Sequence, residues 1–102
     1  MATLLVLYNR PTDEAAFDQY YSATHAPLAK KMPGLRTYET SRGAVLTPSG
    51  PSTYHLVATL RFDTMSDLEA ARASPEGQAA AEDLVNFATG GASVLIFDET
   101  PA

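Results

Sequence analysis

The sequence contains no cysteine and only two histidines, His25 and His55. The absence of cysteine excludes disulfide bonds, thiolate nucleophiles and zinc sites built on cysteine. It also fits a reducing compartment, so we expect a cytoplasmic protein. The two histidines have no partner at the His-x-x-x-His or His-Glu spacing of metal sites, so we predict that the chain holds no metal.

Basic residues are also scarce. Seven Lys and Arg residues stand against twelve Asp and Glu residues, which gives a formal net charge of −5 at pH 7. The longest basic run is the pair Lys30–Lys31, whereas binding to phosphates along a nucleic acid needs a continuous basic stripe. We therefore expect neither a nucleic-acid partner nor an anionic membrane partner.

Long apolar stretches are missing as well. No run approaches the ~20 apolar residues that a membrane span needs. The segment MATLLVLYNR has an apolar run of five or six residues and no basic n-region, so we interpret it as a strand rather than a signal peptide. The 102 residues predict a single domain, residues 1–102, with a modest core that a partner subunit would help to stabilise.

The apolar patterning predicts four strands and two helices in the order β-α-β-β-α-β. The strands are expected at residues 4–8, 35–45, 54–62 and 93–97. Turn-forming residues at 47–52 would join the second and third strands as antiparallel neighbours. This order is typical of an α+β, ferredoxin-like fold, in which both helices cover one face of an antiparallel sheet.

Capping signals mark the helix starts. Thr12 is expected to cap the first helix. Ser66-x-x-Glu69 has the pattern of a capping box and predicts the start of the second helix. Ser74 followed by Pro75 predicts that this helix stops and restarts, with the serine as cap and the proline at the first helical position.

The predicted sheet has apolar residues on both faces. The first strand, LLVLY, is apolar throughout, and the third strand places Val57 and Thr59 on its second face. One layer of helices would leave that second face in water. A second copy of the chain is the simplest cover for it, so we predict a homodimer.

The stretch YYSATHAPLAKKMPG places His25 two residues before Pro27 in what is otherwise a helix. Proline lacks an N–H and its ring clashes with the carbonyl four residues back, so we predict a break at 24–26 and a new helical segment at 27–32. The break would leave backbone groups unpaired beside an imidazole, a side chain that exchanges protons near neutral pH. His25 is then either a ligand-facing acid or base in a pocket wall or a hydrogen-bonded structural residue, and the pattern leaves both open.

Other side chains are expected near the same pocket. Tyr21 and Thr24 lie on the sheet-facing side of the first helix and Phe87 on the apolar face of the second, so we predict that they contact a ligand. Tyr38 either offers its phenol hydroxyl to this space or is an ordinary strand aromatic. Asp83 is interpreted as part of a solvated helix face, or else as the anchor of a loop.

These residues together resemble the EthD family, which is named after ethyl tert-butyl ether degradation. The resemblance is carried by Phe17-x-x-Tyr20-Tyr21-x-x-x-His25-x-Pro27-Leu28, Pro33-Gly34-Leu35, Tyr38, Ser74-Pro75-Glu76-Gly77, Asp83-Leu84-x-x-Phe87 and Gly90-Gly91. It covers nearly the whole chain. It implies a ferredoxin-like protomer that pairs with a second copy into a dimeric α+β barrel, with His25 and Tyr38 in a pocket between helices and sheet.

Two classes of function follow as hypotheses. In the first, the chain is an enzyme for a small, largely apolar carbonyl or aromatic compound in a degradative or biosynthetic pathway. It would use cofactor-free acid–base chemistry, as an isomerase, a dehydratase or a monooxygenase-like oxidoreductase. His25 would be the acid or base, and Tyr38 would hydrogen-bond a developing enolate oxygen. In the second, the chain is a non-catalytic small-molecule-binding or stress-associated dimer that supports a partner oxygenase.

Overall fold

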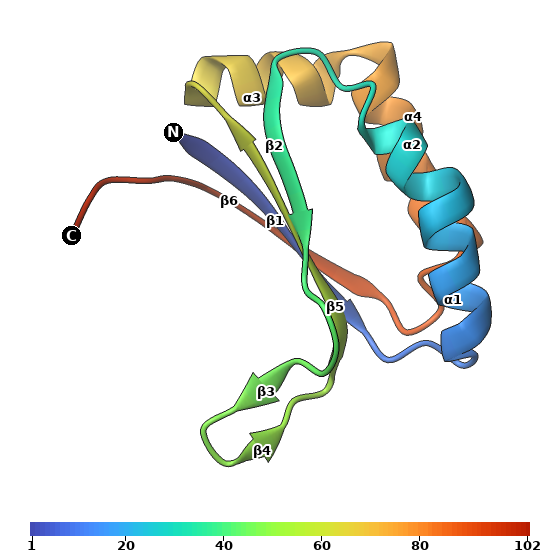
Figure 1. Cartoon of the computed structure of the whole chain (residues 1–102). Coiled ribbons are helices and arrows are strands. Elements are labelled where there is room, and N and C mark those ends of the chain that lie inside the picture. Colours follow the sequence, from blue (N-terminus) through green and yellow to red (C-terminus); the bar gives the residue numbers. More distant parts are fainter.

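A four-stranded antiparallel sheet carries the helices on one of its faces (Figure 1). The computed structural model describes all 102 residues. The strands lie in the order β2-β5-β1-β6 and comprise Ala2–Asn9 (β1), Leu35–Thr40 (β2), Tyr54–Phe62 (β5) and Ala92–Asp98 (β6). The predicted α+β, ferredoxin-like fold is therefore confirmed.

The helices form two arms along this face. The first arm runs from α1 (Glu14–Tyr20) through a π-helical turn, η1 (Tyr21–His25), into α2 (Ala26–Ala29). The second arm comprises α3 (Met65–Ala73), α4 (Pro75–Asp83) and a 3₁₀ turn, η2 (Leu84–Asn86). All of the helices are too short or too polar to traverse a lipid bilayer.

A small hairpin projects from the sheet where the sequence predicted only a loop (Figure 1). Its two strands are β3 (Leu46–Thr47) and β4 (Gly50–Pro51). The strand predicted at 35–45 accordingly ends at Thr40.

The predicted cap of the first helix is wrong by one residue. Asp13, not Thr12, caps α1, because its Oδ1 accepts a hydrogen bond from the N–H of Ala16 at 3.0 Å. Thr12 instead donates its own N–H to Oγ1 of Thr89, also at 3.0 Å. The hydroxyl of Thr12 also donates to Oγ1 of Thr89, at 3.3 Å, so its side chain faces the loop before β6 and not the start of α1.

Of the two caps predicted for the second arm, one is wrong and one is confirmed. Thr64, not Ser66, caps α3, and its side chain accepts a hydrogen bond from the N–H of Asp67 at 3.0 Å. The predicted restart at Ser74 is confirmed, because its hydroxyl accepts from the N–H of Gly77 at 3.0 Å.

The predicted break before Pro27 is wrong. The helix continues through the π turn into α2. The N–H of Ala26 donates to the carbonyl of Tyr21, and Ala26 keeps helical torsions (φ −61°, ψ −45°). A π turn holds one more residue than an α turn and is wider. Pro27 stands in the first turn of α2, where a proline without an N–H is tolerated, so the helix continues without a break. The new segment then ends at Ala29 instead of residue 32.

The π turn also decides which side chains face the sheet. Phe17, Tyr21, His25 and Ala29 are all buried, at a uniform spacing of four residues. An ideal α-helix turns ~100° per residue, so this spacing would drift around the helix by ~40° at each step. A π turn rotates less per residue and cancels part of that drift. His25 therefore points inward and is 5% exposed, whereas Thr24 points to solvent.

Aromatic rings fill the core where the two arms meet the sheet. Phe87, just after η2, lies 5.2 Å from Phe17 and 5.7 Å from Tyr8 between ring centroids. Such aromatic pairs contribute about 0.5–1.5 kcal/mol each beyond the area that they bury. This cluster fixes the end of the second arm against α1 and β1, where the candidate functional residues lie.

The opposite face of the sheet has no helix over it (Figure 1). Strand alternation and register place Leu5 and Leu7 of β1, Val57 of β5, and Leu95 and Phe97 of β6 there. Leu95 is 49% exposed and Phe97 41% exposed. The second apolar face inferred from the sequence is thus present.

Gly90 gives a test of how the loop before β6 packs. A methyl carbon at this position would lie 2.2 Å from the carbonyl oxygen of Arg10, which is backbone and cannot move aside. We expect Gly90→Ala to lower the free energy of unfolding by about 3 kcal/mol, the upper end for overpacking. Urea denaturation would measure it.

Gly43→Ala is the control, because Gly43 has a φ of +75° but open space around it. This substitution should lower the free energy of unfolding by about 1 kcal/mol, because alanine disfavours the backbone conformation of Gly43. Equal losses in the two variants would contradict the packing argument.

Candidate functional site

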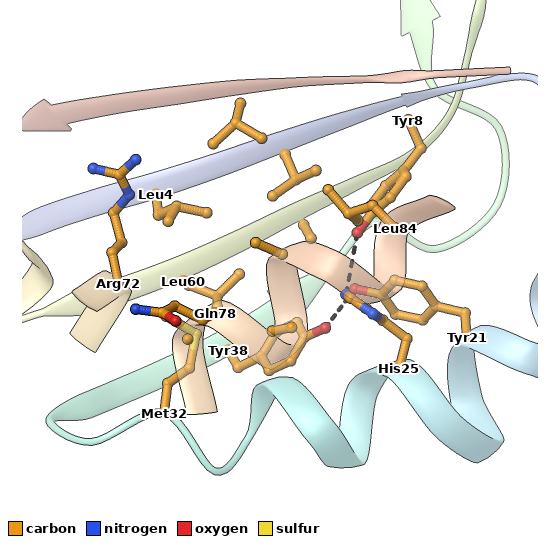
Figure 2. Close-up of a pocket in the computed structure, with 16 residues that line it drawn as sticks. Leu4, Tyr8, Tyr21, His25, Met32, Tyr38, Leu60, Arg72, Gln78 and Leu84 are labelled. Atoms are coloured by element: carbon orange, nitrogen blue, oxygen red, sulfur yellow. Dashed lines mark hydrogen bonds between the residues drawn. The ribbon is translucent and has the colours of Figure 1, made fainter. Parts of the chain in front are cut away.

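A cavity lies between the sheet and the two helical arms (Figure 2). Its volume is about 270 Å³, and twelve of its sixteen lining residues are hydrophobic. Leu4 and Val6 line it from β1, Leu60 from β5 and Leu84 from η2. Ligand pockets commonly measure ~300–1,000 Å³, so this cavity lies just below that range and suits only a small molecule.

His25 lies in the cavity wall and is held by a carboxylate. Its Nδ1 is 2.9 Å from Oδ2 of Asp83, and its Nε2 is 3.4 Å from the hydroxyl of Tyr8. Because an ionised carboxylate only accepts hydrogen bonds, the ring proton resides on Nδ1. The Nε2 lone pair is then directed toward Tyr8 and the cavity, where it can accept a proton.

Asp83 is buried at the end of α4 and accepts three hydrogen bonds. Burial alone would raise the pKa of its carboxyl group. The hydrogen bonds from Tyr20 (2.6 Å), Asn86 (2.9 Å) and His25 outweigh burial and hold that pKa below its usual value. Asp83 is therefore ionised at neutral pH, and it fixes the orientation and tautomer of the imidazole.

The interpretation of Asp83 as part of a solvated helix face is wrong, since it is 8% exposed. Its neighbour Glu82 is exposed. The spacing held a usable signal, because Asp83 follows Ala80 by three residues and precedes Phe87 by four, and both of those are buried. Tyr8 was missed too, although strand alternation puts it on the same face as Val6.

Two tyrosine hydroxyls meet beside His25 (Figure 2). Tyr21 comes from the π turn and Tyr38 from β2, and their oxygens are 2.5 Å apart. Burial raises the pKa of both phenols, so both are protonated at neutral pH. One hydroxyl proton is used between them, and the second can be donated to another oxygen, such as that of Tyr8 or of a ligand.

Some of the predicted site residues line the cavity and others do not. His25, Tyr38 and Tyr21 line the cavity. Thr24 does not, because the π turn rotates it to the solvent side of the helix. Phe87 is buried but packs behind His25, with 4.6 Å between ring centroids, so it supports the imidazole and does not border the cavity.

The second histidine lies outside this cavity. Nε2 of His55 is 2.7 Å from Oδ1 of Asp18, and its ring meets the ring of Phe17 edge-on. No group of three or more His, Cys, Asp or Glu side chains is gathered where it could hold a metal ion.

The sequence of residues 9–91 matches the EthD domain family. The chain belongs to the EthD family. An EthD family protein from Bacillus halodurans has the same fold, with a TM-score of 0.89 and 36% sequence identity over 98% of this chain and 99% of that one. The resemblance noted from the His25 and Tyr38 motifs is therefore confirmed at the level of the family.

Two other relatives extend this comparison of the EthD chain. An uncharacterised 11.0 kDa protein from the thcB–thcC intergenic region of Rhodococcus erythropolis is 41% identical over 99 residues, which is 97% of this chain and 95% of that protein. A dimeric protein of unknown function with a ferredoxin-like fold, from Bacteroides fragilis, has a TM-score of 0.61 and 20% identity over 96% of this chain and 95% of its own. At that identity the likeness shows the fold alone.

The buried carboxylate gives a test with a defined pH dependence. Asp83→Asn keeps the size of the side chain but removes its charge, so we expect the free energy of unfolding to fall by about 1–3 kcal/mol at pH 7. The folded-state pKa of Asp83 lies below its usual value of 3.8. Its stabilisation is therefore fully present above pH 3.8 and is lost as the pH falls through the lower folded-state value.

Urea denaturation between pH 7 and pH 2 would check this. The difference in unfolding free energy between the wild type and Asp83→Asn should decrease below about pH 4. Glu82→Gln removes a charge from the adjacent exposed position and should change stability by less than about 0.5 kcal/mol. A gap that stays constant down to pH 2 would show that the charge of Asp83 does not stabilise the fold.

Proposed function

We propose that this EthD-family chain binds a small, largely apolar carbonyl compound in the cavity and that His25 transfers a proton to or from it. The observation that carries the proposal is the buried hydrogen bond between His25 and Asp83 in the cavity wall. The hydrophobic lining favours an apolar ligand body, and the few convergent polar groups would orient it. The cysteine-free sequence supports a cytoplasmic setting.

His25 is arranged to act first as a base. A proton on the carbon next to a bound carbonyl group would move to Nε2, and the electron pair of the broken C–H bond would pass to the carbonyl oxygen, forming an enolate. The imidazolium that results keeps its Nδ1–H bond to the Asp83 carboxylate, which stabilises the new positive charge. Return of the proton to the same or another carbon completes the transfer.

The tyrosine pair would stabilise the enolate oxygen. The hydroxyl proton that Tyr21 and Tyr38 do not share can be donated to that oxygen, and the bond strengthens as negative charge develops. The same proton transfer begins an isomerisation or a dehydration. It also gives the carbanion that molecular oxygen would attack in a cofactor-free, monooxygenase-like reaction.

Deuterium exchange tests the proton transfer without knowledge of the natural substrate. Acetophenone, a small apolar ketone, would be incubated with the protein in D₂O, and loss of the methyl proton signal would be followed by NMR. We expect the wild type to accelerate the exchange over buffer and His25→Gln to reduce the acceleration by about 10²–10⁴-fold, because glutamine cannot accept the proton.

His55→Gln is the matched control, since His55 also pairs with an aspartate but lies outside the cavity. It should leave the exchange rate unchanged. Full exchange in His25→Gln, with lowered thermal stability, would make His25 a structural residue.

A second candidate is a non-catalytic binding protein that supports a partner oxygenase. One observation favours it: no buried side-chain polar atom lacks a hydrogen-bond partner, so the polar groups of the cavity are satisfied without a ligand. The same NMR experiment separates the two candidates. Binding of acetophenone to the wild type without any accelerated exchange would support this candidate over acid–base catalysis.

We also propose that the chain forms a homodimer, a dimeric α+β barrel, through the helix-free face of the sheet. Leu95 and Phe97 are 49% and 41% exposed there, beside Leu5 and Leu7. A second copy packed on this face would remove these side chains from water. A stable interface of this kind should bury at least ~1,000 Å² in total.

Leu95→Glu tests the dimer, because it places a charge where two sheets would meet. We expect the wild type to scatter light as a dimer at micromolar concentration and the variant as a monomer, since burying an unpaired carboxylate is strongly unfavourable. Val85→Glu is the control: Val85 is 87% exposed on the helical side and should remain dimeric when substituted. A monomeric wild type would refute the proposal.

A further inference from the structure

The cavity has two chemically different ends. Figure 2 shows His25, Tyr8 and Tyr21 gathered at one end and Arg72 and Gln78 at the other. Among the sixteen lining residues, Arg72 is the only lysine, arginine, aspartate or glutamate. A single permanent charge therefore lies at the end away from the acid–base pair.

The charged end is also the open end. His25 is 5% exposed and Tyr8 is 1% exposed, whereas Gln78 is exposed and the side chain of Arg72 is 46% exposed. A ligand would enter past Arg72, and its leading end would reach His25. The part of the ligand that stays at the mouth would be the part next to the guanidinium.

We infer that the ligand carries a carboxylate at the end opposite its carbonyl group, and that Arg72 binds this carboxylate at the cavity mouth. This inference rests on the proposed function and names the substrate class more closely. A guanidinium presents a planar fork of N–H donors that matches a carboxylate, and it keeps its charge at all physiological pH values. The chain has a net charge of −5 and would otherwise repel an anionic ligand.

The contacts of Arg72 leave it free for this role. Its Nη1 donates to Oε2 of Glu69 at 3.0 Å, in a half-exposed pair of neighbouring helix positions. Pairs of this kind contribute little to stability and are readily remodelled. Gln78 lies beside it and uses one amide N–H on the carbonyl of Ala73, so its second N–H remains available. Both side chains thus keep N–H groups that a ligand carboxylate could use.

Two probes that differ only in the carboxylate test the inference. Acetophenone and 4-acetylbenzoate share the ketone and the ring, and the second carries a carboxylate at the far end. Dissociation constants would be measured by NMR titration of the full chain. We expect the wild type to bind 4-acetylbenzoate about tenfold more tightly, and added salt to reduce this preference.

Arg72→Gln should abolish the preference, that is, bring the ratio of the two dissociation constants close to one. Arg72→Lys should keep part of it, because lysine retains the charge but not the fork. Arg36→Gln is the matched control: Arg36 is an exposed arginine paired with Asp63 outside the cavity, and its loss should leave the preference intact.

Equal affinity of the wild type for the two probes, or a preference that survives in Arg72→Gln, would overturn the inference and leave the proposed function standing. Failure of both probes to bind the wild type would overturn the proposed function and the inference together.

Discussion

The hydrogen bond between His25 and Asp83 joins the two helical arms, and the arrangement of the site depends on it. One partner belongs to the π turn of the first arm and the other to the last turn of α4. Both side chains are buried, and Asp83 is the one hydrogen-bond partner of His25 Nδ1, so this nitrogen would be unsatisfied in an apolar setting without Asp83. The pair therefore requires both the π turn, which aims position 25 inward, and the packing that buries the end of α4.

The cavity follows from small side chains placed opposite one another. Ala58 of β5 and Gly77, Ala80 and Ala81 of α4 all line it. Protein interiors are otherwise close-packed, and larger side chains at these positions would fill the space. The same region thus has room for a ligand while the aromatic cluster around Phe87 keeps the neighbouring helix end rigid. The packed support and the open space therefore lie side by side, as the role proposed for His25 would require.

The two faces of the sheet have different surroundings. The face toward the helices supplies the core and the cavity, and residues from all four strands contribute to it or border it. The other face exposes Leu95 and Phe97 and has no helix to cover it. Because successive strand residues point to opposite faces, alternate residues of the same strands belong to the cavity face and to the helix-free face. A change in one set therefore need not disturb the other.

The sequence by itself determined the element order and the fold, because strand alternation and helical periodicity are local properties that a single chain displays. It also pointed to His25, Tyr21 and Tyr38 as residues of one pocket. The tertiary structure alone decided the details that depend on contacts between distant segments. Asp13 caps α1 while the residue before it bonds to Thr89, and a π turn, which no local residue pattern specified, rotates Thr24 outward. Asp83 became the partner of His25 only because the second arm folds back onto the first, a juxtaposition across 58 residues of chain.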